Sequence, residues 1–198
     1  MQSFLHVGCG PQTKASLKGF NNNNWKEIRF DIDEKVNPDI IGTLTDMSRV
    51  ETASIDALYS SHNIEHLFPH EVPLALKEFH RVLKPEGFVV LTCPDLQSVC
   101  QAVAQDQLLE PLYDSPAGPI SAIDILYGHR GYIAKGNHYM AHKCGFTFKA
   151  LCGAFAEAGF KSTFGGRGLK SFDLWLVAFK QDLPPDDVKR IGSIYLPG

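Results

Sequence analysis

The sequence predicts an α/β protein with a single doubly wound sheet that is mostly parallel and closes with an antiparallel C-terminal hairpin. Short apolar runs alternate with segments of helical periodicity, which is typical of parallel strands joined by crossover helices. The first apolar run, residues 4–7, stops at Gly8-Cys9-Gly10-Pro11, a turn of the kind that follows a strand at a ligand-binding edge. Near the other end, the runs 160–164 and 172–179 are joined by a glycine-rich link, which favours a hairpin.

Length and composition place the chain among ordinary globular proteins of one domain. Its 198 residues, 44% hydrophobic and with a net charge of −3, suffice for one core and carry no basic excess that would attract nucleic acid. No apolar run approaches the roughly 18–20 residues that span a bilayer. Five cysteines, without a CxxC pair or a secretory signal, predict reduced thiols and a cytoplasmic location. We therefore expect no nucleic-acid or membrane partner.

The first half of the chain predicts three further short strands, over residues 25–32, 39–42 and 55–59. Between the first strand and the next, residues 12–19 offer only about two helical turns. The strand over 25–32 delivers Asp31 at its end, where a carboxylate can accept hydrogen bonds from both hydroxyls of a ribose. A solvated acidic turn is the alternative interpretation.

The second half predicts helices around one central strand. The strongest helix covers residues 71–83, where apolar side chains recur at helical spacing and form a core-facing stripe. A near-continuous apolar strand follows at 88–93. Further helices are predicted over 97–109, near 120–127, and from an N-cap at Thr147 to Ala158.

The expected domain covers residues 1–180, contains an insertion at about 96–143, and leaves 181–198 as a loosely attached tail. A long irregular insertion in a compact domain is usually functional or disordered. Its last part is rich in histidine and tyrosine, and six residues are the candidates for binding a substrate: His129, Arg130, Tyr132, His138, Tyr139 and His142. A polar loop whose side chains satisfy backbone groups is the alternative. His138, His142 and Cys144 could also suggest a metal site, but no close carboxylate completes the set, and we expect no metal.

Five stretches taken together resemble the class I S-adenosylmethionine-dependent methyltransferases: LHVGCGPQ, RFDID, TLTDM, IDALYSSHNIEHL and FHRVLKPEGFVVLTCPD. They follow one another in the family's order between Leu5 and Asp95. The resemblance implies a Rossmann-like sheet of about seven strands with a reversed hairpin at its end. Because little precedes the first strand, it also implies that the insertion supplies most of the cover over the substrate.

The resemblance also implies which residues bind the cofactor, S-adenosylmethionine. Gly8, Cys9 and Gly10 would line its methionine part, and Asp31 would bind the ribose hydroxyls. The other implied contacts are Ile32 beside the adenine, Thr43, Leu44 and Asp46 at the adenine edge, and Ser61 and His62 beneath the sulfonium. Where the family commonly has an acidic residue at the adenine edge this chain has Thr43, so Asp46 or the backbone would take that contact.

The expected reaction is methyl transfer to a small-molecule or sugar-like acceptor, at oxygen, with S-adenosylhomocysteine as product. A hydroxyl acceptor must lose a proton, and histidine titrates near neutral pH, so His62 and His142 are the candidate bases. The alternative is a non-catalytic cofactor-binding or partner-binding module on a degenerate methyltransferase fold. A nicotinamide oxidoreductase is disfavoured because the third glycine of the dinucleotide motif is missing. No pattern in the sequence indicates an oligomeric state.

Overall fold

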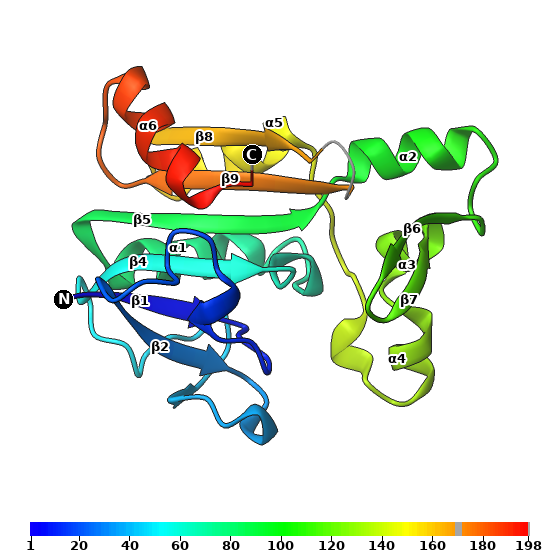
Figure 1. The fold of residues 1–198 in the computed structure, drawn as a ribbon, viewed down its shortest axis with the longest axis horizontal. Helices are drawn as coiled ribbons and strands as arrows, with labels where there is room; N and C mark the ends of the chain where they lie inside the picture. Colours follow the sequence, from blue (N-terminus) through cyan, green and yellow to red (C-terminus); the bar gives the residue numbers. More distant parts are fainter. Residues whose placement is uncertain (169–171, 198) are drawn as a thin grey trace.

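The computed structural model describes residues 1–168 and 172–197, and a seven-stranded sheet organises it (Figure 1). The strands are β1 (Gln2–Val7), β2 (Trp25–Asp31), β3 (Ile40–Ile41), β4 (Ile55–Ser61), β5 (Leu83–Pro94), β8 (Ser162–Arg167) and β9 (Asp173–Phe179). Their order is β3-β2-β1-β4-β5-β9-β8, and β9 runs in the direction opposite to the other six. The predicted fold class is therefore confirmed. The strand order reverses between β1 and β4, which makes this the switch point where such sheets bind ligands.

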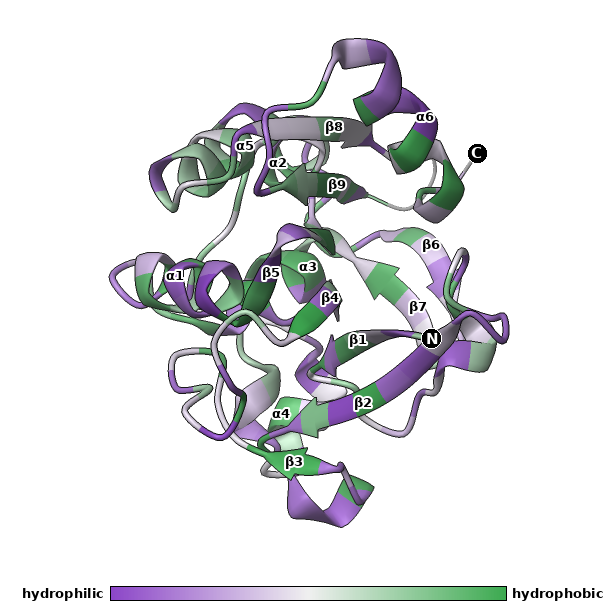
Figure 2. Ribbon diagram, turned by 90° about the vertical axis from the view of Figure 1, so that its left-hand side faces the viewer, coloured by the Kyte–Doolittle hydropathy of each residue, from purple (hydrophilic) through white to green (hydrophobic). Residues whose placement is uncertain are grey.

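Two helices cover one face of the sheet, α1 (Val72–Val82) and α5 (Phe148–Glu157). Their buried side chains, among them Leu76, Phe79 and Phe155, pack against Leu58 and Leu91 of the central strands. The apolar residues 88–91 follow one another in β5, whereas β2 alternates between hydrophilic and hydrophobic residues (Figure 2). This is the expected pattern, because a central parallel strand is buried on both faces and a strand nearer the edge is not.

The opposite face is covered by the segment that joins β1 to β2 and by α6 (Pro185–Tyr195). The joining segment contains only the 3-10 turn η1 (Lys14–Ser16), too short to cover the sheet alone. Tyr195 of α6 fills the remaining space, with its ring 4.8 Å from those of both Phe20 and Phe88 between centroids. The expectation of a loosely attached tail is therefore wrong, because its helix completes the core on this face.

The insertion lies beyond the carboxyl ends of β1, β4 and β5 (Figure 1). It contains α2 (Leu96–Ala104), the hairpin of β6 (Pro111–Ser115) and β7 (Gly118–Ser121), α3 (Ala122–Tyr127), α4 (Arg130–Ala134) and η4 (His138–Met140). Val99, Ile120 and Ile125 form a small core of its own. The hairpin was not expected, because prolines and glycines at 111–119 suggested an irregular loop. The predicted helix over 97–109 ends at Ala104, since Asp106 takes a positive φ of 62°.

Most element boundaries agree with the sequence patterns to within a few residues. Thr147 caps α5 as predicted, with its hydroxyl oxygen accepting from the Ala150 N–H at 3.3 Å. The glycine-rich link is different, because Gly165 and Gly166 lie within β8, where Gly165 pairs with Leu176. A Cβ atom at Gly165 would lie 2.0 Å from the Trp175 carbonyl oxygen, so glycine permits this close strand pairing.

Two further observations bear on the environment of the chain. Each of the five cysteines, all in the described residues, has a free thiol. None of the helices formed by the described residues combines the length and the apolar character that crossing a membrane requires.

Candidate functional site

Two glycines with left-handed backbone conformations shape the turn after β1. Gly8 has φ of 61° and Gly10 has φ of 51°. A Cβ atom at Gly8 would lie 2.0 Å from Oδ1 of Asn63, whereas a Cβ atom at Gly10 would meet nothing within 4 Å. Asn63 follows β4 and donates through Nδ2 to the carbonyl oxygens of Val7 and Ser61, at 3.1 and 2.9 Å. The absence of a side chain at Gly8 therefore permits the Asn63 hydrogen bonds that join the ends of β1 and β4, and Gly10 leaves open space beside the turn.

Asp31 lies at the end of β2 and is 8% exposed. Its Oδ2 accepts from the Gly10 N–H at 2.8 Å, and its Oδ1 accepts from the Asp33 N–H at 2.9 Å. Arg29 holds the turn from the same strand, since its guanidinium donates to the carbonyl oxygens of Gly10 and Asn37. Each carboxylate oxygen has a further lone pair with which it can accept from a ligand hydroxyl. Sequence reasoning missed Arg29, whose role depends on a turn that lies far from it in the chain.

The residues predicted at the adenine edge follow directly after this carboxylate. Ile32 is 47% exposed, an apolar side chain at the rim of the sheet. The Gly42 N–H donates to the Asp31 carbonyl oxygen at 3.0 Å, which brings the half-buried Thr43 and Leu44 beside the end of β2. Asp46 is exposed and accepts from the Ser48 N–H at 3.0 Å, a hydrogen bond that lowers the pKa of its carboxyl.

Cys9 contributes to this turn through its backbone. Its side chain is 2% exposed, and burial raises the pKa of its thiol to about 11. The thiol is therefore buried and neutral at physiological pH. The Cys9 carbonyl oxygen accepts from the Gln12 N–H at 3.0 Å, which closes the turn on itself.

Ser61 ends β4, and His62, the next residue, lines the cleft that faces the insertion. His62 has φ of 52°, rare for a residue other than glycine, and its N–H donates to the Thr92 carbonyl oxygen of β5 at 2.9 Å. Its side chain is 50% exposed, with Nδ1 3.3 Å from Oε1 of Glu65. Burial lowers the pKa of His62, but the adjacent Glu65 carboxylate outweighs this and raises it above its ordinary value.

A cleft of about 190 Å³ separates the strand ends from the insertion. Its walls are formed by η3 (Ile64–His66), the end of β5, the β6–β7 hairpin, α3 and the segment around η4, and by Phe172. It brings together four histidines from distant parts of the chain: His62, His66, His129 and His142. Both candidate bases, His62 and His142, thus line one cleft. Burial lowers the pKa of His142, although the Glu65 carboxylate opposes this effect.

Four of the six residues predicted to bind a substrate are not among those that line this cleft. Arg130 pairs with Asp124 of α3 through Nε–Oδ1 and Nη2–Oδ2 distances of 2.7 and 3.0 Å, which fastens α4 to α3. The other three, Tyr132, His138 and Tyr139, are exposed. Their aromatic and imidazole character was the signal in the sequence, and it does not reveal which way a short helical turn faces.

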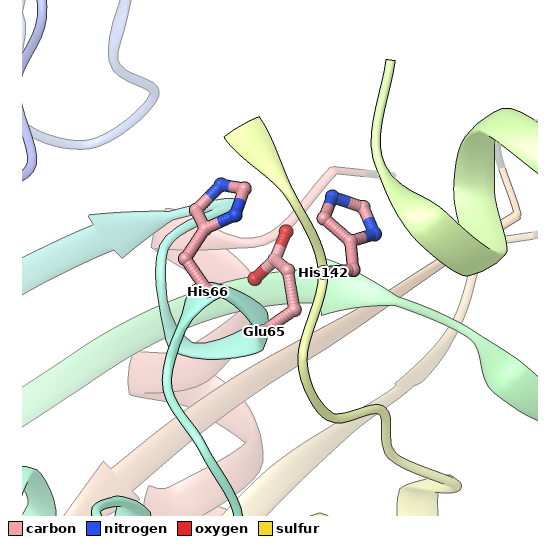
Figure 3. A group of neighbouring side chains, drawn as sticks. All are labelled: Glu65, His66 and His142. Carbon is pink, nitrogen blue, oxygen red and sulfur yellow. The ribbon is translucent and has the colours of Figure 1, made fainter. Parts of the chain in front are cut away.

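Glu65 is a further residue of the site that the sequence did not indicate. It is 1% exposed, although it lies in the short turn that follows β4. Burial raises the pKa of its carboxyl, but the histidines around it, His62 foremost, lower it overall. Figure 3 shows the carboxylate between the rings of His66 and His142. The only feature of the sequence that could have indicated this burial is the position of Glu65 between the apolar residues Ile64 and Leu67.

Comparisons with known proteins agree with this architecture. Residues 5–91 match the family model of the methyltransferase domain. A comparison with curated proteins finds no match.

Solved structures extend the similarity over most of the chain. One is a SAM-dependent methyltransferase from Methanosarcina mazei, with a TM-score of 0.59 and 15% identity over 90% of this chain and 92% of that one. Another, from Archaeoglobus fulgidus, has a TM-score of 0.58 and 14% identity over 90% and 86% of the two chains. A protein from Bordetella parapertussis has a TM-score of 0.58 and 14% identity over 89% of this chain, which spans 61% of that protein's length. At these identities the structures show a shared fold.

Proposed function

We propose that the chain is a class I S-adenosylmethionine-dependent methyltransferase and that it methylates a small-molecule or sugar-like acceptor at oxygen. One observation carries this proposal. The glycine turn after β1 and the histidine-lined cleft meet at the end of β4, where Asn63 packs against Gly8 and His62 faces the cleft. A cofactor in the turn and an acceptor in the cleft would therefore be neighbours across His62.

The residues around the turn suit S-adenosylmethionine. Gly8, Cys9 and Gly10 would line its methionine part, for which the space beside Gly10 supplies room. Asp31 would accept from the ribose hydroxyls, and the exposed side chain of Ile32 would cover one face of the adenine. The remaining contacts would come from Thr43, Leu44 and Asp46 at the adenine edge and from Ser61 and His62 near the sulfonium.

The bound cofactor supplies an electrophilic methyl group, and it leaves the enzyme as S-adenosylhomocysteine. The protein's own task is then to hold the acceptor oxygen in line with that methyl group, which lowers the barrier by fixing orientation. A hydroxyl acceptor also loses its proton, and His62 and His142 line the cleft where that proton would be released. His129, at the far wall of the same cleft, would contact the acceptor.

Calorimetric titration with S-adenosylmethionine and S-adenosylhomocysteine tests the cofactor site. We expect both to bind, with NAD giving no heat. Asp31→Asn should weaken binding roughly 30-fold, because a hydrogen bond to a charged acceptor contributes about 2 kcal/mol. The exposed Asp33→Asn is the matched control and should bind as the wild type does. A screen of hydroxylated acceptors and of their amine analogues then tests the preference for oxygen.

Failure of the folded protein to bind either compound would contradict the proposal and favour a non-catalytic module. Equal losses in Asp31→Asn and Asp33→Asn would contradict the placement of the ribose contact.

A further inference from the structure

The carboxylate of Glu65 is buried, and its only ion pair in the described part of the chain is with His62. Neither of its oxygens accepts a hydrogen bond within the described part of the chain, because Nδ1 of His62 lies 3.3 Å from Oε1 without the geometry of a hydrogen bond. Buried charged groups in proteins are normally paired, hydrogen-bonded or coordinated to a metal ion. A cation bound to this carboxylate would supply the coordination that its oxygens lack.

Two imidazole rings flank the carboxylate, and both are oriented by backbone carbonyl groups. The rings of His66 and His142 lie 5.0 Å apart between centroids. Nδ1 of His66 is 3.1 Å from the Ala141 carbonyl oxygen, and Nδ1 of His142 is 2.7 Å from that of Ile125. Because a carbonyl oxygen only accepts, each Nδ1 carries the proton, and Nε2 of the neutral ring presents its lone pair. Metal-binding histidines usually have this arrangement.

The backbone holds the three side chains together from both sides. The Glu65 carbonyl oxygen accepts from the N–H groups of Lys143 and Cys144 at 2.8 and 3.2 Å. The Cys144 thiol donates to the Ile64 carbonyl oxygen at 3.4 Å. The segment after η4 is thus bonded directly to η3, and the position of His142 beside Glu65 and His66 follows from this pairing.

We propose that Glu65, His66 and His142 bind a divalent transition-metal cation of the Zn²⁺ or Mn²⁺ type. One ligand atom from each of the three lies within 4.8 Å of the other two. Bonds of roughly 2.0–2.2 Å to the cation would draw them closer together. Two imidazoles and one carboxylate suit transition-metal ions, whereas Mg²⁺ and Ca²⁺ prefer oxygen ligands alone.

The cation would leave coordination positions open toward the cleft, because His66 and His142 both line it. A site with three protein ligands keeps room for water or an oxygen of a bound molecule. If the proposed function holds, that oxygen belongs to the methyl acceptor, and the cation positions it. Of the two candidate bases, His142 is then a ligand, and His62 remains to take the proton.

Metal titration of the chelator-treated full-length chain tests the site. We expect one Zn²⁺ or one Mn²⁺ per chain by calorimetry, and weaker binding of Mg²⁺. His66→Ala and His142→Ala should each lower the Zn²⁺ affinity by more than about 100-fold, since the loss of a ligand costs more than the roughly 10–100-fold that follows the loss of a ligand's hydrogen-bond partner. His70→Ala, an exposed histidine four residues after His66, is the matched control and should bind within about twofold of the wild type.

A second measurement does not depend on how the histidine variants fold. Zn²⁺ should raise the melting temperature of the wild type and leave that of Glu65→Gln unchanged, while Glu65→Gln itself folds because it removes a buried charge that accepts no hydrogen bond. The metal site is overturned if the folded wild type binds neither cation, or if His70→Ala loses as much affinity as His142→Ala.

Titration of S-adenosylmethionine into the metal-free protein separates the two proposals. A protein that binds Zn²⁺ at these residues without binding S-adenosylmethionine retains the metal site and contradicts the proposed function. Binding of S-adenosylmethionine by a protein that takes up no cation overturns the metal site alone.

Discussion

Replacing Gly8 by alanine should be far more damaging than the same replacement at Gly10, although both residues have a positive φ. The methyl group at position 8 would lie 2.0, 2.3 and 2.5 Å from Oδ1, Cγ and Nδ2 of Asn63, so the amide must move away. Moving it breaks the hydrogen bonds from Nδ2 to the carbonyl oxygens of Val7 and Ser61. The methyl group at position 10 would meet no atom within 4 Å.

The expected magnitudes follow from these contacts. Left-handed backbone costs a residue with a Cβ atom about 1–2 kcal/mol, and Gly10→Ala should lose only this much. Gly8→Ala should lose the same amount and, in addition, about 0.5–1.5 kcal/mol for each of the two broken hydrogen bonds. The free energy of unfolding should therefore fall by roughly 2–5 kcal/mol, within the usual total of about 5–15 kcal/mol.

Urea unfolding of the two variants, with Asn63→Ala as a third, measures these losses in a double-mutant cycle. Asn63→Ala removes the atoms that clash, so Gly8→Ala in that background should cost no more than Gly10→Ala costs in the wild type. Equal losses for Gly8→Ala and Gly10→Ala would refute the steric argument. An undiminished cost of Gly8→Ala in the Asn63→Ala background would refute it as well.

Two further predictions concern the stability of the core. Arg81 donates to Glu78 at 2.7 Å and holds the pKa of that carboxyl below its ordinary value of 4.5. The pair therefore stabilises the folded state above pH 4.5, and this stabilisation is lost as the pH falls through the lowered pKa. Glu78→Gln should cost about 1–2 kcal/mol at pH 7 and progressively less as the pH falls below 4.5, as urea midpoints across that range would show, and a pH-independent cost would count against the pairing. Tyr195→Ala should cost about 3–5 kcal/mol, because the ring packs between Phe20 and Phe88, whereas the exposed Arg190→Ala should cost under about 0.5 kcal/mol. Similar unfolding midpoints for these last two variants would mean that α6 is not part of the cooperative core.

The parts of the fold that the sequence predicts well are those in which neighbouring residues carry the information. The apolar runs of β1 and β5 are continuous because both faces of these strands are buried, and the stripe on α1 has the helical period. Gly8 and Gly10 are recognisable because their conformations exclude most other residues. Asp31 is recognisable because it ends a strand at the edge where doubly wound sheets bind ligands.

Other features depend on partners that lie far away in the chain, and local patterns do not contain them. The amphipathic α6 looks like a polar tail until the short connection between β1 and β2 leaves Phe20 and Phe88 uncovered. Asn63 is an ordinary turn residue until its amide reaches the carbonyl oxygen of Val7. The fold decides both roles, because each depends on a contact between residues that are far apart in the sequence.

The histidines of the insertion show most clearly how local spacing can mislead. His138 and His142 are four residues apart, which indicates a shared helical face only if the chain between them is an α-helix. Instead, η4 ends at Met140, so His138 stays exposed and His142 turns toward Glu65. No carboxylate near His142 in the sequence could complete a metal site. In the structure the carboxylate is that of Glu65, in the turn after β4, and the backbone hydrogen bonds from Lys143 and Cys144 to Glu65 hold it beside His142. The chemistry of the cleft is therefore set by how the insertion docks on the strand ends, and a change in that docking would alter the site without changing any of its residues.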